Sequence, residues 1–350
     1  MLKRNSLRGP PVSFAMRPNL HPRLVNGRFG DPALFVEGLH SRDAILFDCG
    51  DLAALSPRDL LRVTHLFVTH MHMDHFIGFD TLLRVHVGRA KTIRVAGPPG
   101  IIERVAHKLG GYAWDLAHRY DADLVFEVRE LGDGRPAPRA RFRFKRAFAR
   151  EDLAVPDPGP IDAGAGLVVR HAVLEHHGPC LGYALAEQVH ANVWKTRLAE
   201  RNLAPGPWLQ RLKRAVMEGA PGDQLVALPD GTAQPLAALS ELVSLSPGQV
   251  VAYVTDVADT QENRRRIVAL AHGADLLFLE ARFARADAAQ ARDRAHLTTL
   301  ACGEIARSAG VRRLEPFHFS PRYQDEEERM LQEVATAFAG ADDAASALAR

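Results

Sequence analysis

The chain has 350 residues, 47% of them hydrophobic and 25% charged, which is the composition of a globular protein in one large domain or two modest ones. A formal net charge of +2 excludes a strong overall field for nucleic acid, so RNA binding would need a local basic patch. Three widely spaced cysteines argue against a disulfide framework and are compatible with a reducing cytoplasm. No apolar run is long enough to span a membrane.

The first twenty residues are predicted to form a disordered basic leader. They carry several Lys, Arg and Pro residues without the apolar core of a secretory signal. Either Met1 or Met16 could be the start. Residues 21–350 are expected to form the folded part.

Short apolar runs over residues 34–36 and 44–50 predict buried strands, and Ser56 with Pro57 marks the start of a helix. Asp48 ends the second run. At this stage it is either a turn former or a group that orients a metal ligand.

The strand predicted over residues 64–68 leads directly into a motif of ligand-type residues, namely His70, His72, Asp74 and His75. In an extended backbone the first two imidazoles face one side, and a turn after Met73 would direct the other two side chains to a neighbouring point. This spacing favours two adjacent metal ions over a loop that is merely rich in histidine.

Further elements alternate along the chain up to residue 166. They are predicted as an amphipathic helix over 77–85, a strand over 92–96, a helix over 101–109, half-exposed strands over 121–131 and 139–148, and a Pro/Gly-rich loop over 155–166. Two strands then flank His176 and His177. A histidine at a strand end beside a metal motif favours a ligand over a plain loop residue.

An insert at about 187–248 interrupts this alternation. Residues 194–203 and 209–217 are predicted to be helical, with Trp194 and Trp208 beside them. Six basic residues lie here, namely Lys195, Arg197, Arg201, Arg211, Lys213 and Arg214. Composition alone leaves two readings open: a solvated helical hairpin with two aromatic packing anchors, or a surface for phosphates.

Two later strands, over 249–256 and 275–280, end in carboxylates, and the strand over 314–317 precedes His318. Helices are predicted from His296 to Ser308 and over 326–338. Strand ends are where α/β folds place their chemistry. The collected nitrogen and oxygen ligands suit two zinc ions, with manganese or iron possible, and are His70, His72, Asp74, His75, His176, Asp256 and His318.

The His-x-His-x-Asp-His motif with its later His, Asp and His resembles the metallo-β-lactamase fold superfamily. The resemblance implies an α/β protein built as an αββα sandwich of two mixed sheets with helices outside. It also implies that His70, His72 and His176 hold one metal, that Asp74, His75 and His318 hold the other, and that Asp256 bridges both. His176 is preferred because it precedes Gly182-Tyr183 at the spacing of the family.

Within the superfamily the chain is similar to ribonuclease Z, the tRNA 3′-processing endonuclease. His296-Leu297-Thr298-Thr299 resembles the His-Ser-Thr motif of that family, Glu280-Ala281-Arg282-Phe283 its Glu-Ala-Thr-Phe, and residues 317–323 its closing His-x-Ser-x-Arg-Tyr. Pro205-Gly206-Pro207 makes the insert resemble the arm that grips tRNA. The resemblance suggests a cytoplasmic enzyme that forms a homodimer, with RNA contacts at Lys195, Arg197, Arg211, Lys213 and Arg322.

The implied reaction is phosphodiester hydrolysis by a hydroxide that bridges both metals. Asp74 would orient the hydroxide, and His296, supported by Glu280, would protonate the leaving 3′ oxygen. The alternative for His296 is a helix N-terminal residue without catalytic contact.

Two other functions stay open. The segment over 24–32 lacks the usual Gly-Thr-Gly opening and Phe317 replaces a common Thr, which favours a hydrolase of a small ester, lactone or cyclic phosphodiester. A catalytically silent RNA-binding relative is disfavoured because every candidate ligand is present.

Overall fold

A computed structural model of the chain describes residues 19–39, 41–133, 138–154 and 159–340. The predicted leader lies outside the described residues, apart from Asn19 and Leu20. Leu20 already belongs to the first strand, so the fold begins one residue before the expected boundary. Residues 155–158 of the predicted loop also lie outside the described part.

The first sheet contains eight strands in sequence order, with three parallel pairings at its centre between β3 and β6. Its strands are β1 (Leu20–Leu24), β2 (Leu34–Gly38), β3 (Ala44–Phe47), β4 (Val63–Phe67), β5 (Lys91–Gly97), β6 (Leu124–Glu130), β7 (Arg139–Arg143) and β8 (Arg150–Leu153).

The second sheet contains six strands in the order β18-β17-β16-β11-β10-β9, parallel from β16 to β18 and antiparallel elsewhere. Its strands are β9 (Ile161–Gly164), β10 (Leu167–Glu175), β11 (Pro179–Glu187), β16 (Val250–Val254), β17 (Leu276–Glu280) and β18 (Leu314–Phe317). The strand β9 corrects the expectation of a plain loop over 155–166, because residues 161–164 pair with β10.

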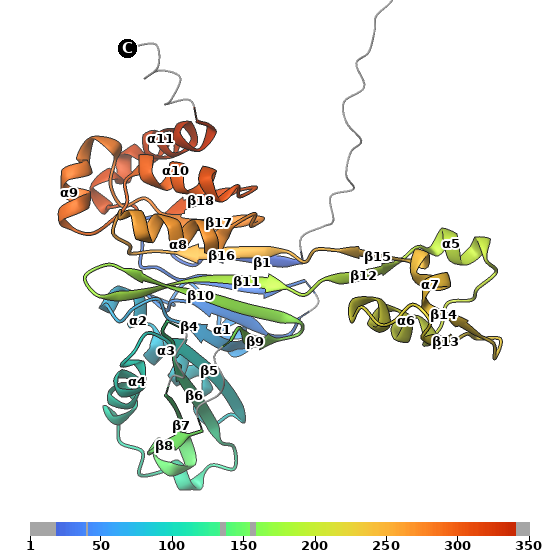
Figure 1. Cartoon of the computed structure of the whole chain (residues 1–350). Helices are drawn as coiled ribbons and strands as arrows, with labels where there is room; N and C mark the ends of the chain where they lie inside the picture. Colours follow the sequence, from blue (N-terminus) through green and yellow to red (C-terminus); the bar gives the residue numbers. More distant parts are fainter. Residues whose placement is uncertain (1–18, 40, 134–137, 155–158, 341–350) are drawn as a thin grey trace, which may run out of the picture.

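Helices cover the outer face of each sheet (Figure 1). On the first sheet these are α1 (Pro57–Arg62), α3 (Phe79–His86) and α4 (Ile101–Gly110); on the second they are α8 (Gln261–Ala271), α10 (Thr299–Ala309) and α11 (Glu327–Ala339). Short elements complete the body, namely α2 (Met73–Phe76), η1 (Ala117–Arg119), η2 (Phe144–Arg146), η4 (Arg285–Asp287), α9 (Ala288–Asp293) and η5 (Pro321–Glu326).

Separate hydrophobic clusters fill the three spaces between these layers. The middle cluster packs Phe47 and Phe67 of the first sheet against Tyr183 and Tyr253 of the second, with ring centroids 5.4–5.8 Å apart across the sheets. The outer clusters join each sheet to its helices. The predicted αββα sandwich is therefore confirmed.

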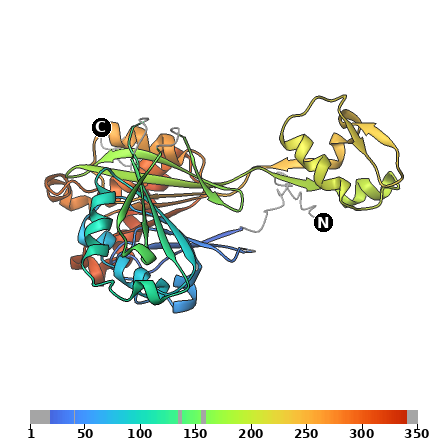
Figure 2. The ribbon, with the colours of Figure 1, turned by 90° about the horizontal axis from the view of Figure 1, so that it is seen from below.

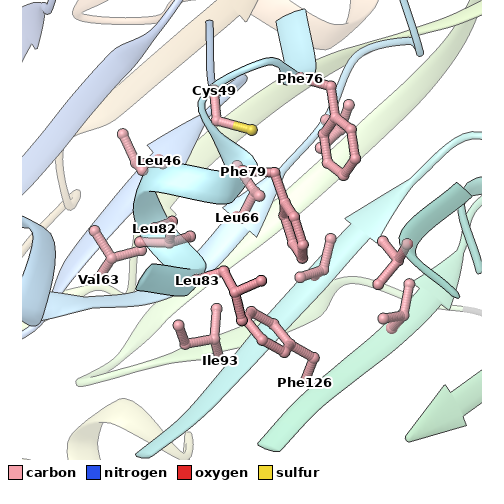
Figure 3. Close-up of a cluster of buried hydrophobic side chains, with 14 of the residues drawn as sticks. Leu46, Cys49, Val63, Leu66, Phe76, Phe79, Leu82, Leu83, Ile93 and Phe126 are labelled. Atoms are coloured by element: carbon pink, nitrogen blue, oxygen red, sulfur yellow. The ribbon is translucent and has the colours of Figure 1, made fainter. Parts of the chain in front are cut away.

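The outer cluster of the first sheet supports the segment that follows the ligand motif (Figure 3). Phe79 of α3 is fully buried, stacks on Phe76 with ring centroids 4.9 Å apart, and meets Phe126 of β6 at 5.2 Å. Gly78 allows the chain to pass closely, because a Cβ there would lie 2.1 Å from the carbonyl oxygen of Gly50. Packing thus fixes α2, which carries Asp74 and His75.

The insert projects away from the sandwich on two paired strands (Figure 2). Its elements are β12 (His190–Val193), α5 (Lys195–Glu200), α6 (Trp208–Met217), β13 (Leu225–Ala227), β14 (Ala233–Pro235), α7 (Leu236–Leu239), η3 (Ser240–Leu242) and β15 (Val243–Ser246). Both predicted helices are present. The arm is more than a helical hairpin, one of the two readings left open, since two strand pairs and its own hydrophobic cluster complete it.

Cys49, Cys180 and Cys302 are buried free thiols, as their number and spacing indicated. Across the described ranges, every helix is too short or too polar to cross a bilayer.

Candidate metal centre

The ligand motif begins where β4 leaves the first sheet. Thr69, the residue before the first histidine, donates its backbone N–H to Asp48 Oδ1 over 2.7 Å and its hydroxyl to the same carboxylate. Asp48 also accepts from His75 Nδ1 at 2.9 Å and from the Tyr253 hydroxyl at 3.0 Å. Asp48 therefore both ends its strand and orients a histidine of the motif, which resolves the alternative that its sequence position left open.

The first group of ligand-type atoms gathers His70, His72, His176 and Asp256, all within 4.8 Å of one another. Asp256 Oδ2 lies 3.3 Å from His70 Nε2 and 3.9 Å from His176 Nε2. His176 donates Nδ1–H to the carbonyl oxygen of Ala295 over 2.8 Å, which leaves the Nε2 lone pair directed at the group. Its neighbour His177 is exposed.

The second group gathers Asp74, His75 and His318 within the same limit. Asp74 Oδ2 lies 3.7 Å from His75 Nε2 and 3.9 Å from His318 Nε2. Asp256 Oδ2 lies 3.3 Å from His75 Nε2, the same distance as from His70 Nε2. Asp256 thus stands between the two groups, and the seven predicted ligands converge on one place.

Two buried nitrogens test whether these residues fit metal ions. Nε2 of His70 and Nε2 of His75 are buried, and neither has a hydrogen-bond partner among the described residues, although Asp256 Oδ2 lies nearby. An unsatisfied buried polar atom costs about 1–3 kcal/mol of folding stability. A metal ion bound to these two nitrogens would remove that cost. Imidazole lone pairs converging with carboxylate oxygens form a donor set that suits a divalent cation.

Three residues of the centre lie at strand ends with left-handed backbone conformation. The φ angles are 55° at Asp48 after β3, 49° at Asp256 after β16 and 58° at His318 after β18. Such a conformation costs a non-glycine residue of order 1–3 kcal/mol and persists only where the surrounding structure imposes it. The sharp turn directs each side chain into the centre instead of along its strand.

A second carboxylate–imidazole pair adjoins the groups. His296 Nδ1 lies 2.9 Å from Glu280 Oε2, and the His296 ring lies 4.8 Å from that of His176 and 5.8 Å from that of His318. Burial alone would raise the pKa of Glu280, but the charge and hydrogen bond of His296 lower that pKa to about 2. Glu280 therefore stays ionised and holds Nδ1–H, which leaves Nε2 of His296 for another partner.

Burial and charge also set the protonation of the ligands. Burial lowers the pKa of His176 to about 4, so this imidazole is neutral near pH 7. Burial would likewise lower the pKa of His75, but Asp256 and Asp48 raise it well above its usual value. Burial would raise the pKa of Asp256, but the neighbouring histidines hold that pKa well below its usual range, and His318 contributes most among them. The carboxylate of Asp256 is therefore ionised.

No family model matches the chain. A curated ribonuclease Z from Deinococcus radiodurans is 35% identical over 299 residues, which cover 84% of this chain and 87% of the relative. The ribonuclease Z of Thermobifida fusca is 32% identical over 315 residues, or 85% of this chain and 81% of the relative. The chain belongs to the ribonuclease Z family.

Solved structures agree on the fold of this ribonuclease Z family member. YhfI from Bacillus subtilis, a metallo-β-lactamase fold protein, is similar over 90% of this chain and 92% of its own, with a TM-score of 0.53 and 15% identity. Unliganded yeast PDE1 is similar over 89% and 92%, with a TM-score of 0.51 and 10% identity. The predicted fold is confirmed, and together with the His/Asp groups it indicates a divalent metal.

The predicted RNA contacts of this family member fall into two sets. On the arm, Lys195 and Arg211 are exposed and Lys213 is half-buried, and none has an ion-pair or hydrogen-bond partner in the part of the chain that the structure describes. Arg197 instead stacks over the exposed Trp194 ring at 5.5 Å. Of the two arm tryptophans, Trp208 is buried and is therefore a packing anchor, whereas Trp194 is exposed.

Arg322, the remaining predicted RNA contact, lies on the body beside the centre. It pairs with Asp287 at 3.1 Å and lies over the rings of Phe283 and Tyr323. Lys195, Arg211 and Lys213 therefore have free charges for a ligand. Arg197 donates a hydrogen bond to the backbone carbonyl oxygen of Glu241, and Arg322 is engaged by Asp287.

Sequence reasoning missed one residue of the centre. Arg282 Nη1 lies 2.7 Å from His318 Nε2, inside the second group. The signal was available, because Arg282 occupies the position of a Thr in the Glu-Ala-Thr-Phe motif that residues 280–283 resemble.

Proposed function

We propose that this chain is a metal-dependent endoribonuclease that removes 3′ trailers from tRNA precursors. Its membership of the ribonuclease Z family and its metallo-β-lactamase fold support a hydrolase. The observation that carries the reaction is the His296–Glu280 pair beside the seven converging ligands. An imidazole held in this way can protonate an alkoxide leaving group, which phosphodiester cleavage requires.

The same proposal assigns the metal ligands. His70, His72 and His176 would hold one ion, Asp74, His75 and His318 a second, with Asp256 shared between them, and zinc is the expected metal. When bound, such ions lower the pKa of water and offset charge on phosphate oxygens.

The remaining chemistry belongs to the chain itself. Asp74 is the carboxylate of the centre that is partly exposed, with a side chain 40% accessible, so it can orient an incoming water molecule. His296 gives a proton to the leaving 3′ oxygen from Nε2. Glu280 keeps the proton on Nδ1 and stabilises the charged ring before transfer.

The arm supports RNA as the substrate. We propose that residues 187–248 are the RNA-gripping part of a single catalytic domain, with Lys195, Arg197, Arg211 and Lys213 binding phosphates of the substrate. Arg322 would contribute from beside the centre. The proposal includes a cytoplasmic location and a homodimer. Sedimentation of the purified protein would test the dimer.

The small ester, lactone or cyclic diester is not favoured as a substrate, because the relatives that match most of this chain are named ribonuclease Z. The test compares a tRNA precursor carrying a 3′ trailer with a simple aryl phosphodiester, each with zinc or manganese. Cleavage at the trailer junction is expected. If the protein hydrolysed the aryl diester but left the tRNA precursor intact, a small substrate would replace tRNA in the proposal. If it bound no metal and hydrolysed neither substrate, it would be a catalytically silent relative.

A further inference from the structure

Arg282 lies inside the metal centre, and the proposed reaction gives it no role. It follows β17 by two residues, is half-buried, and is tied to the end of β18 because its carbonyl oxygen accepts from the backbone N–H of Ser320 over 3.0 Å. Within the described ranges, no carboxylate lies at ion-pair distance from its guanidinium. The polar partner of this charge is Nε2 of His318, 2.7 Å from Nη1.

This contact occupies one nitrogen of His318. An arginine always donates, so in this contact Nε2 of His318 is the acceptor and its lone pair is used. Nδ1 is in turn 2.7 Å from Asp256 Oδ1, an acceptor. Nε2 is also the nitrogen that lies 3.9 Å from Asp74 Oδ2, so the lone pair available to the second group is the one that Arg282 occupies.

The first group has no such competitor. Nδ1 of His176 is bound by a backbone carbonyl, and Nε2 of His70 has no hydrogen-bond partner among the described residues. A metal ion needs a free lone pair on each imidazole. A fixed positive charge beside one position also opposes a divalent cation there, in the same direction as the occupied lone pair.

We propose that Arg282 controls the second metal position. Its guanidinium holds Nε2 of His318 and must leave this nitrogen before the histidine can bind a metal ion. The position formed by Asp74, His75 and His318 is therefore weaker than the position formed by His70, His72 and His176. This inference rests on the metal centre of the proposed function.

The test measures stepwise zinc binding to the metal-free protein by competition with a chromophoric chelator. Arg282→Met removes the charge and the donors but keeps an unbranched side chain. It is expected to tighten the weaker step by about 10–100-fold, the range over which hydrogen-bond partners of ligands alter metal affinity, and to leave the tighter step unchanged. Arg312→Met removes an exposed arginine at the opposite end of the parallel strands and is expected to change neither step.

A double variant locates the effect. Arg282→Met combined with His318→Ala is expected to lose the gain in the weaker step, since the nitrogen released by the first change is absent. Arg282→Gln, also neutral, tests the same point if Arg282→Met fails to fold. The inference would be overturned if the wild-type protein and the neutral variant had the same zinc affinity at the weaker step. It would also be overturned if the gain in zinc affinity survived without His318. Zinc bound by neither protein would instead overturn the proposed function.

Discussion

The carboxylate of Glu280 and the imidazole of His296 form one unit, with Oε2 2.9 Å from Nδ1 at the edge of the ligand cluster. Glu280 is fully buried and His296 is 9% exposed, so the pair is shielded while the ring still borders the centre. Two histidine rings, those of His176 and His318, lie within 6 Å of the His296 ring. Under the proposed function, a proton carried by His296 would therefore lie beside the phosphate that the centre binds.

The identity of the leaving group tests this general acid. His296→Ala is expected to slow cleavage of an RNA diester, whose leaving group is a strongly basic alkoxide, by about 10²–10⁴-fold. A nitrophenyl diester has a weakly basic leaving group that departs without a proton, so the same variant should lose little rate on it. Both rates are measured at saturating substrate with equal metal content.

Glu280→Gln supplies the control within the pair. Adding it to His296→Ala should cost little more than His296→Ala alone, because groups that act as a unit are not additive. Equal losses on both leaving groups would mean that His296 has a structural role instead.

Asp48 is expected to govern metal affinity without contacting metal. Asp48→Asn removes the carboxylate that accepts Nδ1–H of His75 at 2.9 Å, so the ring loses its fixed orientation. Zinc affinity of the second position should fall about 10–100-fold, measured by chelator competition. Asp275→Asn, which alters a carboxylate at the opposite end of β17, should leave zinc affinity unchanged. Wild-type affinity in Asp48→Asn would contradict the orienting role.

Arm charges are expected to act on RNA alone. Replacing Lys195 and Arg211 with Ala should raise KM for a tRNA precursor and reduce the salt dependence of binding by about one unit of slope per lost phosphate contact. Hydrolysis of an aryl diester should not change. Replacing Arg312 and Arg313, exposed arginines on the body, removes the same charge and should have no such effect. A uniform loss on both substrates would instead indicate a damaged fold.

His65 is expected to make stability depend on pH. Burial, with Arg94 adding to it, lowers the pKa of His65 in the folded protein to about 4, whereas the pKa in the unfolded chain is about 6.5. The unfolded chain therefore takes up the proton first, and stability is lost as pH falls from about 6.5 to about 4. The loss from this group is up to about 3 kcal/mol.

Urea unfolding across this pH range measures the effect. His65→Leu should flatten the pH dependence of stability. The change should cost little at pH 7, because Nε2 of His65 has no hydrogen-bond partner among the described residues and Nδ1 meets the half-buried hydroxyl of the adjacent Thr64, at 3.0 Å. His107→Leu, at an exposed helix position, should keep the wild-type curve. A His65→Leu curve parallel to that of the wild type would refute the assignment.

Local patterns account for what the sequence predicted well. Short apolar runs correspond to buried strands such as β2 and β3, and Gly310 caps α10 with a φ of 63°. The candidate ligands of the centre could be identified because each follows a strand or lies in the compact motif.

Features that depend on distant pairing were not predictable. The strand β1 contains Pro22 and the charged Arg23, and only its pairing with β2 at the sheet edge makes it a strand. The arm strands β12 and β15 pair across about fifty intervening residues. The replacement of Thr by Arg282 in the motif over residues 280–283 was visible, but the contact of Arg282 with His318 depends on how β17 and β18 end side by side.

The most direct test of the account maps the products of a tRNA precursor with a 3′ trailer, using protein stripped of metal and then reloaded. We expect no cleavage by the stripped protein, cleavage at the trailer junction after zinc or manganese is restored, and a large loss of that cleavage in His296→Ala. Cleavage that persists without metal, or a reloaded protein that leaves the precursor intact, would contradict it.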